Sequence, residues 1–307
     1  MAAPQRSALP SQVPQPSWLA VSVALAVVYV VWGSTYLGIR IVVEQADPLA
    51  AMGQRYITAG VLLAIVLALR HGPRHLAVTR RQALGCLLLG LLLPLLGNGM
   101  VSVAESLGVT SGVIALLIAV APLAIVVFRT VEHDVPGPRT IAGVLAGFCG
   151  LALLVSLGRN TGDGVPIGPA LLGLFAGTCW AFGSYIQPRL RLPQDPFVIA
   201  VYEMLFGGLL GTAVAFATGE DWTLDYSVRT WVALLYLVVF GSVVAFSAYI
   251  WLVARAPISL VATYAYVNPV IAVFLGWLVL GESITWVTVV GGSIVVGSVA
   301  VVISAER

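Results

Sequence analysis

Residues 107–128 read LGVTSGVIALLIAVAPLAIVVF and contain no charged side chain. These 22 residues exceed the ~20 that an α-helix needs to cross the ~30 Å hydrocarbon core of a bilayer. The run is continuous, whereas the strands of a membrane barrel alternate in polarity. Nine similar apolar runs lie at 18–39, 47–69, 82–103, 140–157, 166–187, 197–218, 229–251, 257–279 and 284–303. The sequence therefore predicts an all-α membrane protein with ten transmembrane helices.

The composition supports the same fold class. Hydrophobic residues make up 60% of the 307 residues and charged residues only 9%, whereas soluble domains carry about 25% charged residues. Hydrocarbon offers no hydrogen bonds, so the backbone of a spanning segment must pair within the segment, as it does in a helix. We find no stretch that reads as a soluble domain or a long linker.

The placement of the basic residues predicts the orientation in the membrane. All fifteen are arginines. If the N-terminus is cytoplasmic, three lie outside (Arg40, Arg159 and Arg229), Arg55 falls within a span, and eleven lie inside (Arg6, Arg70, Arg74, Arg80, Arg81, Arg129, Arg139, Arg189, Arg191, Arg255 and Arg307). Arginine is enriched in cytoplasmic loops. We therefore predict a multi-pass protein of the cytoplasmic (inner) cell membrane with both termini in the cytoplasm.

The N-terminal segment and the cysteines add little chemistry. Residues 1–17 contain four prolines and are predicted to form a disordered cytoplasmic tail. A secretory signal is the alternative, because Ala24 and Ala26 form an A-x-A pattern, but the apolar run continues to 39 and is too long for one. The three cysteines show no C-x-x-C spacing and are predicted to be small core residues.

The two halves of the chain repeat each other. The offset stays between 147 and 150 residues for the pairs Trp32/Trp180, Tyr36/Tyr185, Arg40/Arg189, Arg55/Glu203, Pro122/Pro269 and Glu132/Glu282. Each half contains five spans, so the second half must be inverted in the membrane relative to the first. We expect a first five-helix repeat over 18–158 and a second, inverted repeat over 166–304, enclosing a central cavity.

Several motifs resemble a known family. WGSTYLGIR (32–40), GQRYITAG (53–60), GNGMVSVAE (97–105), VTSGVIALLIAVAPL (109–123) and ATYAYVNPVIAVFLGWLVLGE (262–282) resemble the EamA-type drug/metabolite transporter superfamily. The resemblance covers about 18–304 and is strongest to amino-acid and metabolite exporters of the YedA/YddG type. It implies a ten-helix inverted-repeat carrier with a central cavity. The family's Gly-Glu pair near the end of the ninth span is present as Gly281 and Glu282, whereas the first half has VEHD around Glu132.

Polar and aromatic residues recur along single faces of the predicted helices, where positions i, i+4 and i+7 lie together. Asn98, Ser102 and Glu105 share one such face, and Ser242, Phe246 and Tyr249 share another. Aromatic rings suit planar or cationic groups, and amides or hydroxyls suit an amino-acid backbone. The predicted substrate-binding residues are Trp32, Tyr36, Asn98, Ser102, Trp180, Ser184, Tyr249, Tyr264 and Asn268.

These residue types also have structural roles. Tryptophan and tyrosine often anchor helix ends at the membrane interface, and serine often bonds to its own or a neighbouring helix. Asn98 either pairs with another helix or faces a wet chamber.

Charges and prolines inside the spans are candidates for gating or coupling: Arg55, Glu105, Pro122, Glu203 and Pro269. A charge in a membrane span needs a partner or a function. Arg55 and Glu203 occupy corresponding positions and are interpreted either as a functional pair or as a contact that only stabilises the fold. A proline frees the carbonyl four residues back and kinks its helix.

The sequence favours a secondary carrier that exports amino acids, aromatic or other neutral ones, or similar small metabolites. We find no Walker A, G-x-S-x-G or HExxH motif, so we expect no enzyme activity, no metal and no cofactor. The expected partners are a small-molecule substrate and membrane lipid, without nucleic acid, and the chain is expected to act as a monomer. A membrane-embedded enzyme and a non-transporting accessory subunit are the alternatives.

Overall fold

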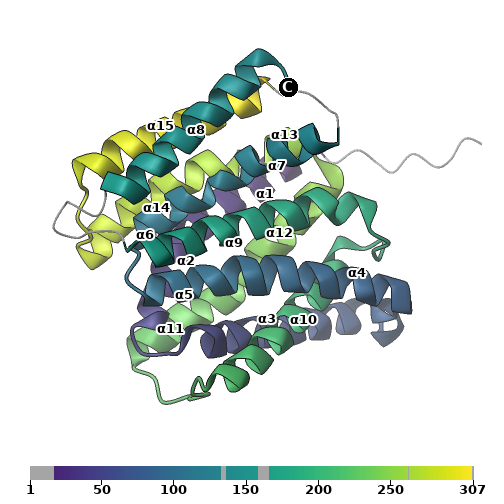
Figure 1. Ribbon diagram of the computed structural model, residues 1–307. Helices are drawn as coiled ribbons and strands as arrows, with labels where there is room; N and C mark the ends of the chain where they lie inside the picture. The colour runs from purple at the N-terminus through teal and green to yellow at the C-terminus, as the bar shows by residue number, and fades with distance from the viewer. Residues whose placement is uncertain (1–16, 133–135, 158–165, 262, 306–307) are drawn as a thin grey trace, which may run out of the picture.

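The computed structural model describes residues 17–132, 136–157, 166–261 and 263–305, and these residues form helices and connecting turns without a strand. The predicted tail lies outside the described residues apart from Ser17, whose hydroxyl caps the first helix through Ala20 N. The α-helices are α1 (Trp18–Val27), α2 (Gly33–Val43), α3 (Pro48–His71), α4 (Arg80–Gly90), α5 (Met100–Ser106), α6 (Ser111–Ile118), α7 (Val120–Val131), α8 (Pro138–Leu157), α9 (Ile167–Ile186), α10 (Pro196–Thr218), α11 (Val228–Tyr236), α12 (Ala245–Arg255), α13 (Ile258–Val261), α14 (Tyr264–Leu280) and α15 (Trp286–Ala305) (Figure 1).

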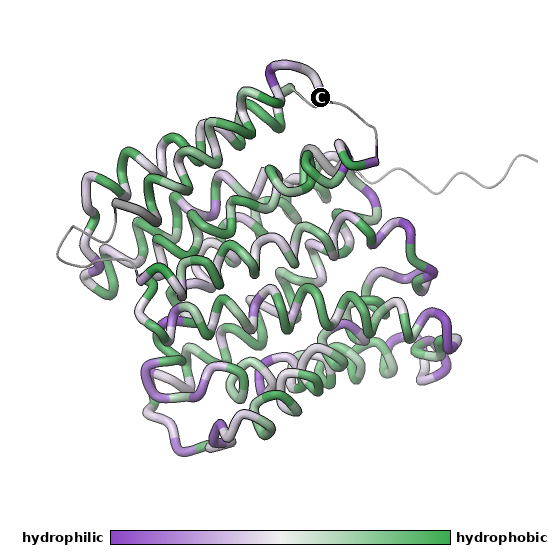
Figure 2. Tube along the Cα trace, in the orientation of Figure 1, coloured by the Kyte–Doolittle hydropathy of each residue, from purple (hydrophilic) through white to green (hydrophobic). Residues whose placement is uncertain are grey.

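Most of the predicted spans are present as long apolar helical segments. Within the described residues, eight segments are long and apolar enough to cross a membrane: Trp18–Val43, Pro48–His71, Arg80–Ser106, Ser111–Val131, Ile167–Arg189, Pro196–Thr218, Val228–Arg255 and Trp286–Ala305. The remaining two predicted ranges hold shorter apolar helices, Pro138–Leu154 and Tyr264–Leu280. Figure 2 shows apolar residues along the helices and polar residues concentrated at the turns. Large apolar side chains such as Phe216 and Leu145 point outward and are exposed, as lipid-facing residues would be.

Corresponding helices of the two halves pack against each other at opposite edges of the molecule. α8 lies along α15 at one edge, and α3 lies along α10 at the other (Figure 1). Glycines permit this close approach. A Cβ on Gly208 of α10 would lie only 2.7 Å from the backbone nitrogen of Ile57 in α3. α10 approaches α4 as closely, because a Cβ on Gly207 would lie 2.7 Å from the carbonyl oxygen of Gly90. The other helices lie between these two edges.

Three spans contain π-helical segments, which the sequence analysis did not predict. They are Val28–Trp32 between α1 and α2, Leu91–Gly99 between α4 and α5, and Leu237–Val244 between α11 and α12. Pro94, which has no N–H to donate, lies inside the second. π-Helical insertions are rare and occur frequently at functional sites. All three supply residues to the centre of the molecule described next.

Candidate functional site

A narrow hollow of about 40 Å³ lies in the centre of the bundle. Eleven residues line it: Trp32, Thr35, Tyr36, Arg55, Gly97, Asn98, Val101, Ile118, Ala176, Trp180 and Tyr264. They come from both halves of the chain. The structure therefore brings together five of the predicted substrate-binding residues and one of the predicted gating residues.

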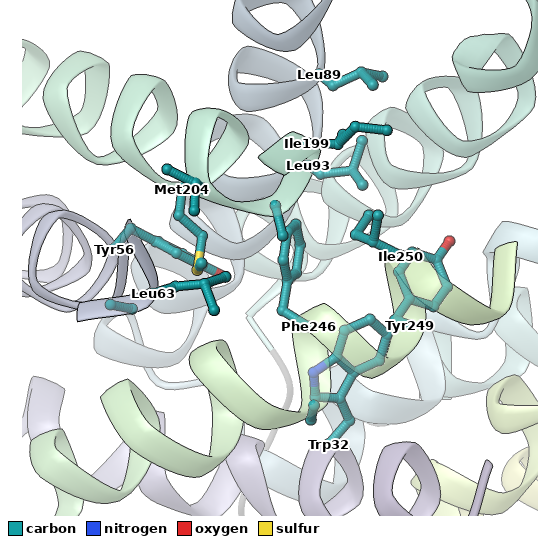
Figure 3. Close-up of a cluster of buried hydrophobic side chains, with 14 of the residues drawn as sticks. Trp32, Tyr56, Leu63, Leu89, Leu93, Ile199, Met204, Phe246, Tyr249 and Ile250 are labelled. Atoms are coloured by element: carbon teal, nitrogen blue, oxygen red, sulfur yellow. The ribbon is translucent and has the colours of Figure 1, made fainter. Parts of the chain in front are cut away.

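An aromatic cluster forms one wall of the hollow, with Trp32 at its centre. The Trp32 ring centroid lies 5.3 Å from that of Trp180, 4.8 Å from that of Tyr249 and 5.5 Å from that of Tyr264. Figure 3 shows Trp32 beside Tyr249 and Phe246. The Trp32 indole nitrogen donates to the carbonyl oxygen of Gly241 at 3.2 Å. This bond to a π-helical segment of the second half fixes the orientation of a first-half ring.

A second, smaller hollow of about 20 Å³ lies beside the first, and Trp180 and Tyr264 line both. Predicted residues Ser184, Tyr249 and Pro122 also line it. The Ser184 hydroxyl donates to the carbonyl oxygen of Trp180 at 2.9 Å and lies 2.8 Å from the Tyr249 hydroxyl. Two aromatic side chains therefore form the boundary between two cavities.

Arg55 is a buried cation beside the central hollow. It is only 4% exposed. Its Nε donates to the Ser242 hydroxyl at 2.8 Å, and its Nη1 donates to the Asn98 side-chain oxygen at 3.3 Å. The guanidinium carbon also lies 4.8 Å from the centroid of the Tyr56 ring. These contacts are neutral, so within the described residues the charge of Arg55 is held by polar groups rather than by an acid.

Glu203 and Glu105 are fully buried and lie apart from Arg55. Neither carboxylate oxygen of either residue has a hydrogen-bond partner in the described part of the chain. The direct Arg55–Glu203 contact considered from the sequence is therefore not formed in this conformation, and neither side chain reaches the surface. Arg40 donates to the backbone carbonyl of Glu105 rather than to its carboxylate.

The other predicted residues lie around the cavities. Ser102 donates to the backbone carbonyl of Asn98 at 3.1 Å and lines a smaller hollow on another side of Arg55. In the orientation that satisfies its neighbours, the Asn268 amide nitrogen donates to the carbonyls of Tyr29 (3.1 Å) and Tyr264 (3.3 Å). Asn268 therefore joins two spans and lines neither of the two larger hollows.

The two prolines sit differently in their spans. Pro122 follows a break at Ala119 that separates α6 from α7, whereas Pro269 lies inside α14. A proline near the start of a helix is tolerated because the first N–H groups have no intrahelical acceptor, and one in the interior removes a hydrogen bond.

Two features of this region were not predicted. Thr35 lines the central hollow, and its hydroxyl donates to the carbonyl of Trp32 at 2.7 Å. The i+3 spacing of Thr35 from Trp32 was the signal that could have identified it.

Glu282 binds the start of α6. One of its carboxylate oxygens accepts from Ser111 N at 2.8 Å, and the other accepts from the Ser111 hydroxyl at 2.9 Å and Gly112 N at 3.2 Å. The repeat identified Glu282, but no sequence pattern indicated its partner.

An all-helical chain with several membrane-length helices and a hollow between its halves is the architecture of a membrane carrier. The chain belongs to the EamA-like transporter family, whose model matches residues 18–156 and again 168–304. A transporter role follows from that membership.

Individual relatives agree with the family. The chain is 37% identical over 279 residues to YedA of Escherichia coli (strain K12), described as an uncharacterized inner membrane transporter, covering 91% of this chain and 89% of that one. It is 25% identical to the uncharacterized transporter YetK of Bacillus subtilis (strain 168), covering 93% and 87% of the two chains. A crystal structure with 18% identity superposes with a TM-score of 0.65 over 94% of this chain and 98% of the other, which supports the fold.

Proposed function

We propose that this chain is a secondary carrier that exports amino acids, aromatic or other neutral ones, or similar small metabolites across the cytoplasmic membrane by alternating access. The observation that carries this proposal is the central hollow, whose aromatic and amide lining comes from both halves of the chain. A binding site between two repeats is the arrangement that rocking carriers use. The relative YedA is an inner membrane transporter, which supports the location.

The topology proposed from the sequence fits this function. Repeats over 18–158 and 166–304 with five spans each place the second half upside down relative to the first, with both termini in the cytoplasm. The site then lies near the middle of the membrane, where two related bundles can close on either side of it.

Trp180 and Tyr264 are the proposed inner boundary of the substrate site, because they separate the two hollows. Rotation of these rings would join the hollows and open a path past Ser184 and Pro122. The helix break at Ala119, just before Pro122, supplies a place for α7 to move relative to α6. If export is coupled to protons, Glu105 or Glu203 must titrate, since they are the buried acids of the described spans.

The test is counterflow in proteoliposomes with a panel of labelled amino acids, with and without a pH gradient. Trp32→Ala should reduce transport by about 10-fold or more, because it removes the ring at the centre of the cluster. Asn98→Ala should also reduce it. Trp286→Ala is the matched control, because Trp286 is 59% exposed on α15.

Transport of no member of the panel would contradict the amino-acid proposal. Wild-type affinity in both Trp32→Ala and Asn98→Ala would show that the central hollow is not the substrate site.

A further inference from the structure

The central hollow has a charge without a counter-charge. Of the eleven residues that line the hollow, Arg55 is charged and the other ten are neutral. The ionisable groups that lie near Arg55 are the phenols of Tyr56 and Tyr236, which are neutral at physiological pH. A buried charge is normally paired, because an unpaired one loses its hydration without compensation. The arrangement therefore lacks an anion.

The hydrogen bonds of Arg55 leave donors available for such an anion. A guanidinium has five N–H donors in a planar fork. Two bonds, to Ser242 and Asn98, are formed with described residues. The Asn98 side-chain oxygen accepts one of these bonds, and no bond from the amide nitrogen of Asn98 is formed with the described residues, so its two N–H groups are further donors at the hollow. Arg55 and Asn98 together therefore offer more donors than acceptors.

Arg55 is also held in a fixed position. Ser242 fixes its Nε at 2.8 Å, Asn98 binds its Nη1, and the Tyr56 ring lies 4.8 Å from its central carbon. A guanidinium fixed in this way loses little conformational freedom when it binds a carboxylate, and two parallel N–H···O bonds to a carboxylate match its geometry. A lysine would provide the charge without this fork.

We propose that the substrate carries a carboxylate that binds Arg55 and Asn98, while its planar apolar body lies against Trp32, Trp180 and Tyr264. The inference rests on the carrier function proposed above and names the substrate class for that site. The site selects small monocarboxylates with an aromatic or planar body. Amino acids are accepted through the same carboxylate, and amines that lack it are excluded because they would place a second positive charge beside Arg55.

Three probes with the same phenyl ring and different charges test this. Phenylpyruvate carries a carboxylate alone, phenylalanine carries a carboxylate and an ammonium, and phenethylamine carries an ammonium alone. Wild-type proteoliposomes should transport phenylpyruvate and phenylalanine, and each of these two, unlabelled, should compete with labelled substrate in counterflow. Phenethylamine should be neither transported nor able to compete.

Variants of Arg55 sharpen the test. Arg55→Gln should weaken the apparent affinity for phenylpyruvate by about 10- to 100-fold, because charge-assisted hydrogen bonds are lost. Arg55→Lys should give a smaller loss, because it keeps the charge and loses the fork. Arg229→Gln is the matched control, since Arg229 forms an exposed ion pair with Glu44 and neither residue lines the hollow.

A second measurement does not depend on the folding of an Arg55 variant. Phenylpyruvate and phenylalanine should change the tryptophan fluorescence of the wild-type protein saturably through Trp32 and Trp180, and phenethylamine should not. Equal binding of phenethylamine and phenylpyruvate, or unchanged affinity in Arg55→Gln, would overturn the carboxylate inference and leave the carrier function standing. Failure of every amino acid and every probe to be transported would instead count against the proposed function.

Discussion

Glu132 and Glu282 occupy corresponding positions in the two repeats but have different surroundings. Glu282, after α14, accepts three hydrogen bonds from the first residues of α6. Glu132, after α7, has a side chain that is 53% exposed and pairs with Arg189 at 2.8 Å. α6 and α7 are parts of one membrane span, so these two acids mark its opposite ends. One end is tied to the other half through a helix terminus, and the other end is held by a surface ion pair.

The difference has a physical cause. The first N–H groups of a helix have no intrahelical acceptor, and the helix dipole favours a negative charge there. A carboxylate that accepts hydrogen bonds from these N–H groups and lies at this end of the dipole contributes more to stability than an exposed ion pair, which contributes little. Glu220, after α10, also contacts a helix start, because it accepts from Leu49 N at 2.9 Å and Ala50 N at 2.8 Å at the beginning of α3. Two acids of the second half therefore hold two helices of the first half.

The largest effect is expected from Glu282→Ala. It removes three hydrogen bonds and leaves the backbone N–H groups of Ser111 and Gly112 without an acceptor. Ser111 is fully buried, so water cannot replace the lost bonds. We expect a loss of about 2 kcal/mol in stability, measured as a lower melting temperature of the detergent-solubilised protein. Glu132→Ala is the matched control, and an equal loss in both variants would show that the two ends do not differ.

Gly276→Ala tests the same contact without changing the acid. A Cβ at Gly276 would overlap the Glu282 carboxylate and approach the Ser111 hydroxyl to 2.7 Å. The methyl group should push Glu282 away from α6 and lower the melting temperature in the same direction. Gly297→Ala is the control, because a Cβ there meets nothing within 4 Å.

An intermediate effect, dependent on pH, is expected at Glu220. Burial raises the pKa of this carboxyl above its usual value, the amides of Ala50 and Leu49 lower it in part, and Asp47 raises it further. A folded-state pKa above the unfolded value means that the folded protein binds the proton more tightly. The stability from this group is complete below the unfolded pKa of about 4.3 and is lost as pH rises through the folded pKa.

Glu220→Gln should therefore remove a decline in melting temperature that the wild-type protein shows as pH rises from about 4 upward. At neutral pH the change should be smaller than for Glu282→Ala, because the glutamine oxygen can still accept from Leu49 and Ala50. A pH profile identical to that of the wild type would contradict this assignment.

The sequence predicted the helical class, most of the spans, the repeat and much of the central lining. Span length and apolar continuity are local properties, so they can be counted along the chain, and Trp32 and Trp180 were found because the repeat pairs them. The bond between Glu282 and Ser111 joins residues 171 positions apart, and no local pattern encodes such a partner. The three π-helical segments also escaped prediction, because one extra residue per turn changes neither composition nor apolar length.

The Arg55–Glu203 pairing is a contact that the sequence suggested and the structure does not form. Symmetry in the sequence suggested that two opposite charges could meet, but Arg55 binds Ser242 and Asn98, and both Glu203 oxygens lack a partner in the described chain. Two residues at corresponding positions lie at the same place within their own repeats, but this does not bring them close to each other. Their side chains contact each other only if both point toward the axis between the halves, and that direction is fixed by the rotation of α3 and α10 about their own axes.

The smallest effect is expected from Glu132→Ala measured alone. Its partners, Arg189 and Tyr185, are on the exposed side of α9 and the turn that follows it, so the variant should lose no more than about 1 kcal/mol. The loss should shrink further as salt is raised, because ions screen exposed charges, whereas the loss in Glu282→Ala should persist, since its partners are buried amides. Melting temperatures of both variants at low and high salt separate the two kinds of contact. A salt-independent loss at Glu132 as large as that at Glu282 would mean that this acid also holds a helix terminus, and the two ends of the span would then be alike.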